Sequence, residues 1–90
     1  VAQMAAILAR EKRYPRRARL RREEGTGHLR FTLDPSGRII SQSIARSSGH
    51  ASLDEEIAAL LGRVAPLPPI PSELGRDPLE VLVPIRFRLR

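Results

Sequence analysis

Cysteine is absent from this chain of 90 residues, and aromatic side chains are scarce, with one Tyr, two Phe and no Trp. Without cysteine, the chain has no disulfide framework, no thiolate zinc site and no thiol nucleophile. It also lacks an apolar run long enough to cross a membrane, and we expect no signal peptide within these residues. Because the chain does not begin with Met, we expect it to be an excised domain whose anchor or address lies outside it.

Candidate catalytic and metal-binding residues are also few. His28 and His50 stand apart in the sequence and have no cysteine beside them, so they form no metal-ligand spacing. His50, Asp54 and a nearby serine supply the residue types of a catalytic triad, but this arrangement before a helix is more typical of loop and cap chemistry. The length fits one small domain without two lobes and a cleft. We therefore predict no enzymatic activity and no cofactor.

Positive charge is abundant and concentrated near the start of the chain. The net charge is +6, and residues 1–24 hold eight cations against three acids. An Arg-rich segment over residues 10–22 is of the kind that binds phosphates, so a nucleic-acid-binding module is one interpretation. However, Phe31 and Phe87 are expected on buried strand faces, which leaves few rings for base stacking. We expect no nucleic acid partner and keep this interpretation as the alternative.

Three helices are predicted from apolar periodicity and helix-start signals. The first spans residues 1–13, and the second spans residues 15–22 with Ala18 and Leu20 as its apolar anchors. The third begins at Ser52, whose spacing to Glu55 forms a capping box. The apolar stripe of this helix contains Leu53, Ile57, Leu60, Leu61 and Val64. An extended proline-rich connector is expected to follow over residues 66–78.

Two strands joined by a turn are predicted in the first half of the chain. Residues 27–34 alternate apolar and polar side chains, and Asp34-Pro35-Ser36-Gly37 suits a type I turn. The second strand covers residues 38–47, where three isoleucines cannot all face the core unless the strand is bulged. These isoleucines are Ile39, Ile40 and Ile44.

The last strand, over residues 79–89, has the cleanest alternation in the chain. Pro84 lies in its middle and cannot donate to a ladder, which places the strand at an edge of the sheet. The predicted fold is α+β in the order α-α-β-β-α-β, with a three-stranded antiparallel sheet packed against helices. The sheet consists of a two-strand hairpin and this final edge strand. Such an edge offers unpaired N–H and C=O groups to an extended guest or to a second copy, so a homodimer is an open alternative.

Taken in order, several short motifs resemble the C-terminal domain of the TonB family over residues 10–90. They are Tyr14-Pro15 with an Arg/Ala-rich turn, Glu24-Gly25, a strand ending in Phe31, Pro35-Ser36-Gly37-Arg38, Ser47-Ser48-Gly49-His50, Leu53-Asp54, a proline-rich exit and Val83-Pro84-Ile85-Arg86-Phe87. The domain division that follows is an N-terminal helix over residues 1–13 and a TonB-like domain over residues 14–90. A TonB-like or TolA-like domain of another envelope-spanning machine is a related alternative.

The resemblance implies a periplasmic domain of an energy transducer that is anchored in the inner membrane. Such a transducer works with ExbB and ExbD, which draw on the proton gradient and contact parts outside this chain. The domain is expected to bind the TonB box of outer-membrane receptors for siderophores, haem and cobalamin, and to transmit force to them.

The resemblance also implies two sets of partner-binding residues. Strand addition of the TonB box is expected along the last strand, at Leu79, Glu80, Val81, Leu82, Val83, Pro84, Ile85, Arg86, Phe87, Arg88 and Leu89. Contact with the receptor plug is expected at Glu11, Arg13, Tyr14, Pro15, Arg16 and Arg17, of which Arg17 matches a family arginine. Glu11-Lys12-Arg13 stands where the family has Gln-Pro before Tyr-Pro.

Overall fold

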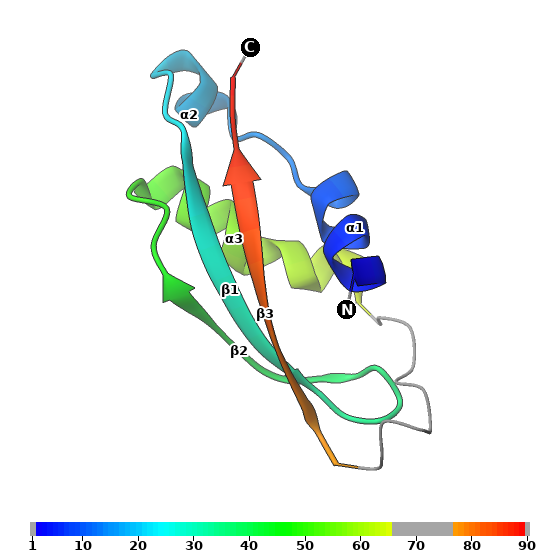
Figure 1. Cartoon of the computed structure of the whole chain (residues 1–90). Helices are drawn as coiled ribbons and strands as arrows, with labels where there is room; N and C mark the ends of the chain where they lie inside the picture. The colour runs from blue at the N-terminus through cyan, green and yellow to red at the C-terminus, as the bar shows by residue number, and fades with distance from the viewer. Residues whose placement is uncertain (1, 66–76, 90) are drawn as a thin grey trace.

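The computed structural model describes residues 2–65 and 77–89. In chain order its elements are α1 (Ala2–Glu11), α2 (Arg16–Leu20), β1 (Gly25–Leu33), β2 (Ile39–Arg46), α3 (Ala51–Val64) and β3 (Leu79–Phe87). This order and the three-stranded antiparallel sheet confirm the predicted α+β fold (Figure 1). Val1 and residues 66–76 of the predicted connector lie outside the described residues.

The sheet has the strand order β2-β1-β3, so β1 is central and β3 lies at an edge, as Pro84 predicted. β1 pairs with β3 in one unbroken antiparallel register, from Gly25 opposite Phe87 to Leu33 opposite Leu79. The turn between β1 and β2 is closed by the Gly37 amide, which donates to the Asp34 carbonyl at 3.0 Å. Gly37 has a φ of 92°, a conformation that glycine adopts without a steric penalty.

Two irregularities in β2 resolve the conflict among its isoleucines. The register with β1 shifts between Thr32 and Leu33 and again between His28 and Leu29. The first shift leaves Ile40 unpaired, so Ile39 and Ile44 both pack against the core while Ile40 stays 56% exposed. A bulge is the device that inserts one residue and changes which face its neighbours occupy.

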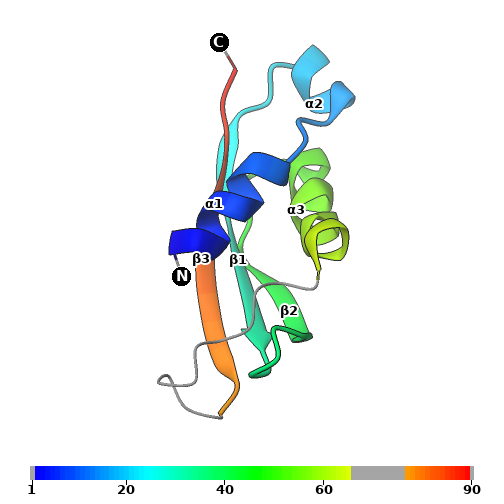
Figure 2. The same cartoon turned by 90° about the vertical axis from the view of Figure 1, so that its right-hand side faces the viewer.

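The core lies between one face of the sheet and helices α1 and α3. α3 runs along that face, and α1 lies beyond β3, on the side away from β2 (Figures 1 and 2). α3 approaches β1 closely at Gly27, where an added Cβ would lie 2.4 Å from Ile57 Cδ1. The buried side chains are Met4, Leu8, Ala18, Leu29, Phe31, Leu33, Leu53, Ile57, Leu60, Leu61, Val81, Val83, Ile85 and Phe87. Among the described helices, none is long and apolar enough to cross a bilayer.

Two details of the predicted helices are wrong. Leu20 is 73% exposed and anchors nothing, so Ala18 is the one buried side chain of α2. α3 begins at Ala51 rather than at Ser52, and its N-cap residue His50 makes no side-chain cap bond. The capping box fails because the Ser52 hydroxyl instead donates to Glu23 Oε1 at 2.5 Å. The hydroxyl that local spacing assigned to the helix start therefore donates to a carboxylate that is distant in the sequence.

The Asp54 carboxylate binds the loop before α3 to the first turn of the helix. It accepts hydrogen bonds from Ser47 Oγ at 2.5 Å, from the Ser48 amide at 2.9 Å and from Ser48 Oγ at 2.7 Å. Burial alone would raise the pKa of this carboxyl, but the serine bonds outweigh burial and lower the pKa below its ordinary value.

The predicted last strand extends too far. β3 ends at Phe87, because its partner β1 begins at Gly25, directly opposite. Beyond that point the ladder has no backbone partner, and the Leu89 amide donates at 2.6 Å to the Glu24 carboxylate instead. Arg88 and Leu89 therefore follow the strand rather than belong to it.

Candidate functional site

The outer edge of β3 carries backbone groups that β1 does not use. In an antiparallel pair, successive residues direct their N–H and C=O alternately toward the partner and away from it. Pro84 lies opposite His28 and has no N–H to donate, so its position belongs to the outward-facing set. The same phase applies to Glu80, Leu82 and Arg86, which therefore point their backbone groups toward the free edge.

The side chains of β3 alternate in the same phase. Val81, Val83, Ile85 and Phe87 are buried in the core, whereas the four residues with outward backbone groups have exposed side chains. Leu82 is 53% exposed, and Glu80 forms an exposed ion pair with Arg30 at 3.5 Å. An extended guest would thus meet a hydrogen-bonding edge without disturbing the core.

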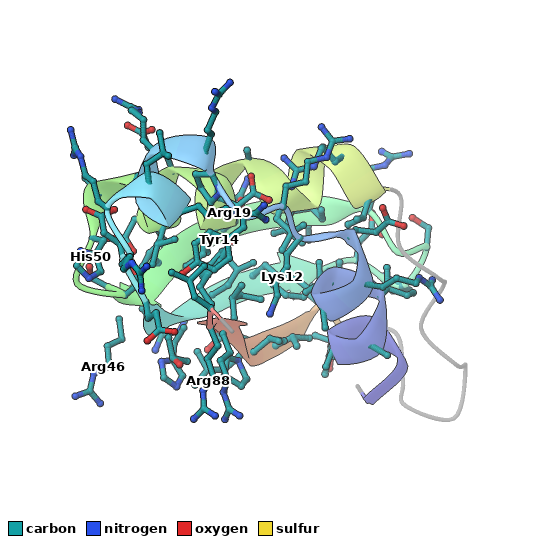
Figure 3. All side chains as sticks on the ribbon, turned by 90° about the horizontal axis from the view of Figure 1, so that it is seen from above. Lys12, Tyr14, Arg19, Arg46, His50 and Arg88 are labelled. Atoms are coloured by element: carbon teal, nitrogen blue, oxygen red, sulfur yellow. The ribbon has the colours of Figure 1, made fainter. Side chains whose placement is uncertain are left out.

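Lys12 occupies one end of this edge. Its ammonium donates to the carbonyl oxygen of Arg86 and lies 5.5 Å from the centroid of the Phe87 ring. The bond to Arg86 independently shows that this carbonyl faces outward. Partial burial and the nearby Arg86 guanidinium lower the pKa of the Lys12 ammonium. Figure 3 shows Lys12 and Tyr14 in the region between the helices and β3.

Tyr14 connects three parts of the chain at the same end of β3. Its hydroxyl donates to the Glu23 carbonyl, and its ring meets Phe87 edge to face at 5.4 Å between centroids. The guanidinium of Arg19, in α2, also lies over the Tyr14 ring, 5.8 Å from its centroid. Burial, together with the Glu24 carboxylate, raises the pKa of the Tyr14 phenol.

The remaining residues of the predicted docking segment lie on the surface beside α3. The Arg13 amide donates at 2.7 Å to Glu56, which also pairs with Arg63. Arg17 forms an ion pair with Glu55 at 3.5 Å, and both side chains are 70% exposed. Glu11 and Arg16 are exposed, and Pro15 precedes α2 as its N-cap residue. The backbone bond from Arg13 to Glu56 therefore attaches the segment to α3, while the charged side chains of Glu11, Arg13, Arg16 and Arg17 are exposed to solvent.

The structure brings the two predicted sets of residues together at one place. Tyr14 contacts Phe87, and Lys12 contacts Arg86, so the docking segment meets the C-terminal end of β3. Sequence reasoning did not assign Lys12 to either set. The available signal was composition, because Lys12 is the single lysine among 16 cations.

The histidines do not assemble a catalytic group. His50 Nδ1 lies 3.6 Å from Glu23 Oε2, while Asp54 bonds directly to the serines, so the ring does not stand between acid and hydroxyl. His28 is half-buried rather than a plain surface residue, and its Nδ1 is buried without a partner. Within residues 2–65 and 77–89, no group of three acidic or histidine side chains is placed to hold a metal ion.

Comparison with known proteins finds a matching family and relatives of similar sequence in bacteria. The family described as Gram-negative bacterial TonB protein C-terminal matches residues 10–89. Protein TonB of Pseudomonas putida is 37% identical over 83 residues, covering 91% of this chain and 34% of that protein. Protein TonB of Pasteurella multocida is 35% identical over 82 residues, covering 91% of this chain and 31% of that protein. The chain thus spans about a third of the length of these relatives.

Solved structures of similar domains share the fold. The solution structure of the Helicobacter pylori TonB C-terminal domain, residues 179–285 of that protein, has a TM-score of 0.79 at 22% identity, covering 94% of this chain and 76% of that one. The HasB C-terminal domain has a TM-score of 0.61 at 39% identity, covering 99% of this chain and 69% of that one.

Proposed function

The chain belongs to the Gram-negative TonB C-terminal family, and from that premise we propose that it captures the TonB box of an outer-membrane receptor by strand addition to β3. The observation that supports this proposal is the outer edge of β3, where Glu80, Leu82 and Pro84 direct outward backbone groups that no other strand of the described residues uses. Backbone pairing of this kind binds an extended segment with little dependence on its side chains.

Each added hydrogen bond contributes about 0.5–1.5 kcal/mol net, and ordering the guest offsets part of the gain. A few such bonds therefore give a modest and reversible affinity. Reversibility suits a domain that must engage a receptor, transmit force and release it again. In this proposal the domain performs no chemical step and needs no cofactor.

The exposed cations beside α3 form a second part of the proposed interface. We assign contact with the receptor plug to the segment from Glu11 to Arg17, in which Arg17 extends into solvent and is held only by an exposed ion pair with Glu55. Exposed pairs of this kind are worth about 0–1 kcal/mol, so an acidic receptor group can replace Glu55 at little cost.

The wider role follows the family. We propose that the domain lies in the periplasm, that the full-length protein is anchored in the inner membrane, and that ExbB and ExbD act on parts outside this chain. The proton gradient would then supply the force that the captured strand carries to the receptor, during uptake of siderophores, haem or cobalamin.

A peptide titration tests strand addition directly. A receptor-derived TonB-box peptide is added to isotope-labelled protein, and the backbone amide shifts are followed by NMR. We expect the largest shifts within residues 79–89, with the amides of Glu80 and Leu82 prominent among them. Largest shifts elsewhere would contradict the proposal.

A binding assay with duplex DNA at two salt concentrations tests the alternative. Phosphate contacts by the segment 10–22 would give tight binding that weakens steeply as salt rises, roughly in proportion to the number of contacts. We expect weak DNA binding, together with peptide-induced shifts in β3. Strong salt-dependent DNA binding with no peptide response would favour the nucleic-acid-binding module instead.

A further inference from the structure

Helix α2 forms one end of an elongated molecule. The chain measures 44 × 20 × 18 Å along its principal axes. α2 lies at one end of the long axis, whereas the turn between β1 and β2 lies at the other (Figures 1 and 2). α2 contacts α3 and buries one side chain, that of Ala18. Most of its surface is therefore free to meet a partner.

Leu20 lies on the side of α2 that faces away from the core. Successive residues of a helix stand about 100° apart around its axis, so Leu20 is roughly 160° from the buried Ala18. Leu20 is 73% exposed, the largest value among the exposed large hydrophobic side chains of the described residues. Arg16 and Arg17 lie on either side of it on the same outward face. An apolar side chain therefore occupies the centre of this face.

Arginines surround Leu20, and few of their charges are neutralised. Five exposed arginines lie in α2 and the turn that follows it: Arg16, Arg17, Arg19, Arg21 and Arg22. Among the described residues, one of the five forms an ion pair, Arg17 with Glu55, and both side chains are 70% exposed. Glu23 and Glu24 follow directly, so residues 16–24 carry a net charge of +3. Figure 3 shows nitrogen-tipped side chains spreading outward around α2.

Arg22 occupies a backbone position at which glycine is the usual residue. The Glu23 amide donates to the Ala18 carbonyl at 2.8 Å, and the Arg22 amide donates to the Arg19 carbonyl at 3.1 Å. These two bonds form a Schellman ending, and Arg22, with a φ of 55°, is its left-handed residue. Glycine would adopt this conformation without strain, so the chain keeps a cation here at a conformational cost.

An exposed apolar side chain surrounded by cations matches the surface of a bilayer that contains anionic lipids. Guanidinium groups bind phosphates bidentately, and leucine can enter the boundary between headgroups and acyl chains. Lipid headgroups move laterally, so they can meet arginines that point in several directions. A nucleic acid would leave Leu20 without a contact. The nearest ring, that of Tyr14, is packed against Phe87 and is not free to stack on a base.

We propose that residues 16–22 dock onto an anionic bilayer, with Leu20 inserted at the level of the headgroups. The arginines around it bind the lipid phosphates. This contact is separate from strand capture, because Leu79 and the first half of β3 lie toward the opposite end of the molecule (Figure 1). The domain can therefore rest on a membrane and still offer the beginning of β3 to a peptide.

The test exploits the absence of tryptophan from the chain. Leu20→Trp places a single fluorescent reporter on α2. Leu82→Trp is the matched control, because Leu82 is another exposed leucine, 53% accessible, on β3. Each variant is mixed with vesicles of equal parts phosphatidylglycerol and phosphatidylcholine, with vesicles of phosphatidylcholine alone, and with soluble glycerol phosphate. Emission spectra are recorded at low and at high salt.

We expect the emission of Leu20→Trp to shift to the blue only with the vesicles that contain phosphatidylglycerol, and less so at high salt. Leu82→Trp should show no shift. In sedimentation with the same vesicles, Arg21→Gln should bind about fivefold more weakly than the wild type, the effect of one cation near an anionic surface. Arg38→Gln, which removes a cation from the turn between β1 and β2, should bind as the wild type does.

Several results would overturn this inference. No shift for Leu20→Trp, or equal shifts for both reporters, would show that α2 does not dock onto the bilayer. The same shift with phosphatidylcholine alone would exclude a role for the arginines, and the same shift with glycerol phosphate would indicate a simple phosphate site. A response to duplex DNA but not to vesicles would assign the segment to nucleic acid.

None of these results bears on strand addition, which the peptide titration of β3 tests separately. Leu20→Trp and Arg21→Gln change exposed side chains, so their thermal unfolding should match that of the wild type. This measurement excludes a folding defect as the cause of weaker binding.

Discussion

The ring of Tyr14 stands edge-on to the ring of Phe87, with centroids 5.4 Å apart and planes inclined at 87°. Tyr14 precedes α2, and Phe87 is the last residue of β3, so this contact joins the two ends of the domain. The Tyr14 hydroxyl also holds the chain after α2 through the Glu23 carbonyl. One side chain thus places the Arg-rich segment beside the edge that is proposed to bind the receptor.

Replacing Tyr14 should separate the ring contact from the hydroxyl contact. Tyr14→Phe keeps the ring and should lower the free energy of unfolding by about 1 kcal/mol, the value of one hydrogen bond. Tyr14→Ala removes both contacts and should cost about 3–5 kcal/mol, as for other large aromatic truncations. Urea unfolding measures both changes. Leu20→Ala, at a side chain that is 73% exposed, should change stability by no more than about 0.5 kcal/mol.

Two glycines should respond to alanine in opposite directions. At Gly25 an added Cβ would lie 2.3 Å from the backbone oxygen of Ser48, so the loop before α3 must move, at a cost of about 1–3 kcal/mol. At Gly62, an exposed position of α3, nothing lies within 4 Å of the new Cβ. Gly62→Ala should therefore gain about 0.5–1 kcal/mol through helix propensity. Thermal unfolding of both variants checks the contrast, and equal effects would contradict it.

Asp54 should make stability depend on pH in the acid range. Its pKa is lower in the fold than in the unfolded chain, where a value of about 3.9 is expected, so the unfolded chain binds its proton first as pH falls. The contribution of Asp54 is therefore complete above that unfolded value and is lost as pH falls through the folded pKa.

Asp54→Asn measures that contribution. At neutral pH the variant should be less stable by about 1–3 kcal/mol, because the serine hydroxyls lose a charged acceptor. The difference from wild type should shrink as the pH falls through the folded pKa of Asp54, because the wild-type carboxyl then becomes protonated too. Urea unfolding at several pH values follows this trend, and a constant difference across the range would rule out the charge of Asp54 as the cause.

Proline scanning of β3 should reveal which amides face outward. Leu82→Pro removes an N–H that the sheet does not use, so it should still fold but bind the TonB-box peptide about 2–10 times more weakly. Leu82→Ala keeps this N–H and should bind nearly as the wild type. Val83→Pro removes a donor to β1 and should unfold the domain. Circular dichroism shows which variants fold, and peptide titration measures their affinity. Normal binding by Leu82→Pro would contradict the assignment of the Leu82 N–H to the outer edge of β3.

Arg17→Glu should weaken binding to a whole receptor more than binding to the TonB-box peptide. The variant repels acidic receptor groups and also loses its pairing with Glu55, but it leaves β3 untouched. Arg38→Glu is the matched control, since it makes the same charge change in the exposed turn between β1 and β2. Surface plasmon resonance with both ligands measures the effect. Equal losses for receptor and peptide would show that Arg17 does not contact the plug.

Several parts of the fold followed from local rules. Alternation in β1 and β3 located the core faces, the Asp34–Gly37 turn set the hairpin, and Pro84 identified β3 as an edge strand. These predictions are confirmed because each depends on backbone geometry within a few residues. The expected bulge in β2 is also present, at the position that lets Ile39 and Ile44 share the core.

Other parts required contacts between distant residues. Local spacing assigned Ser52 to a helix cap, yet Glu23, 29 residues away, accepts its hydrogen bond. Similarly, alternation through Leu89 suggested a longer strand, but β3 ends where its partner β1 begins. A hydroxyl or an amide donates to the acceptor that the fold brings closest. The local sequence pattern does not show which acceptor that is.

The sequence by itself determined the fold class, the edge position of β3 and the Arg-rich segment around Tyr14. Only the tertiary structure decided that this segment meets the end of β3, because the contacts of Tyr14 with Phe87 and of Lys12 with Arg86 join residues more than seventy positions apart. Periodicity describes one element at a time and cannot show which elements pack together. Packing of these elements is therefore what brings the lone lysine, Lys12, to the C-terminal end of β3.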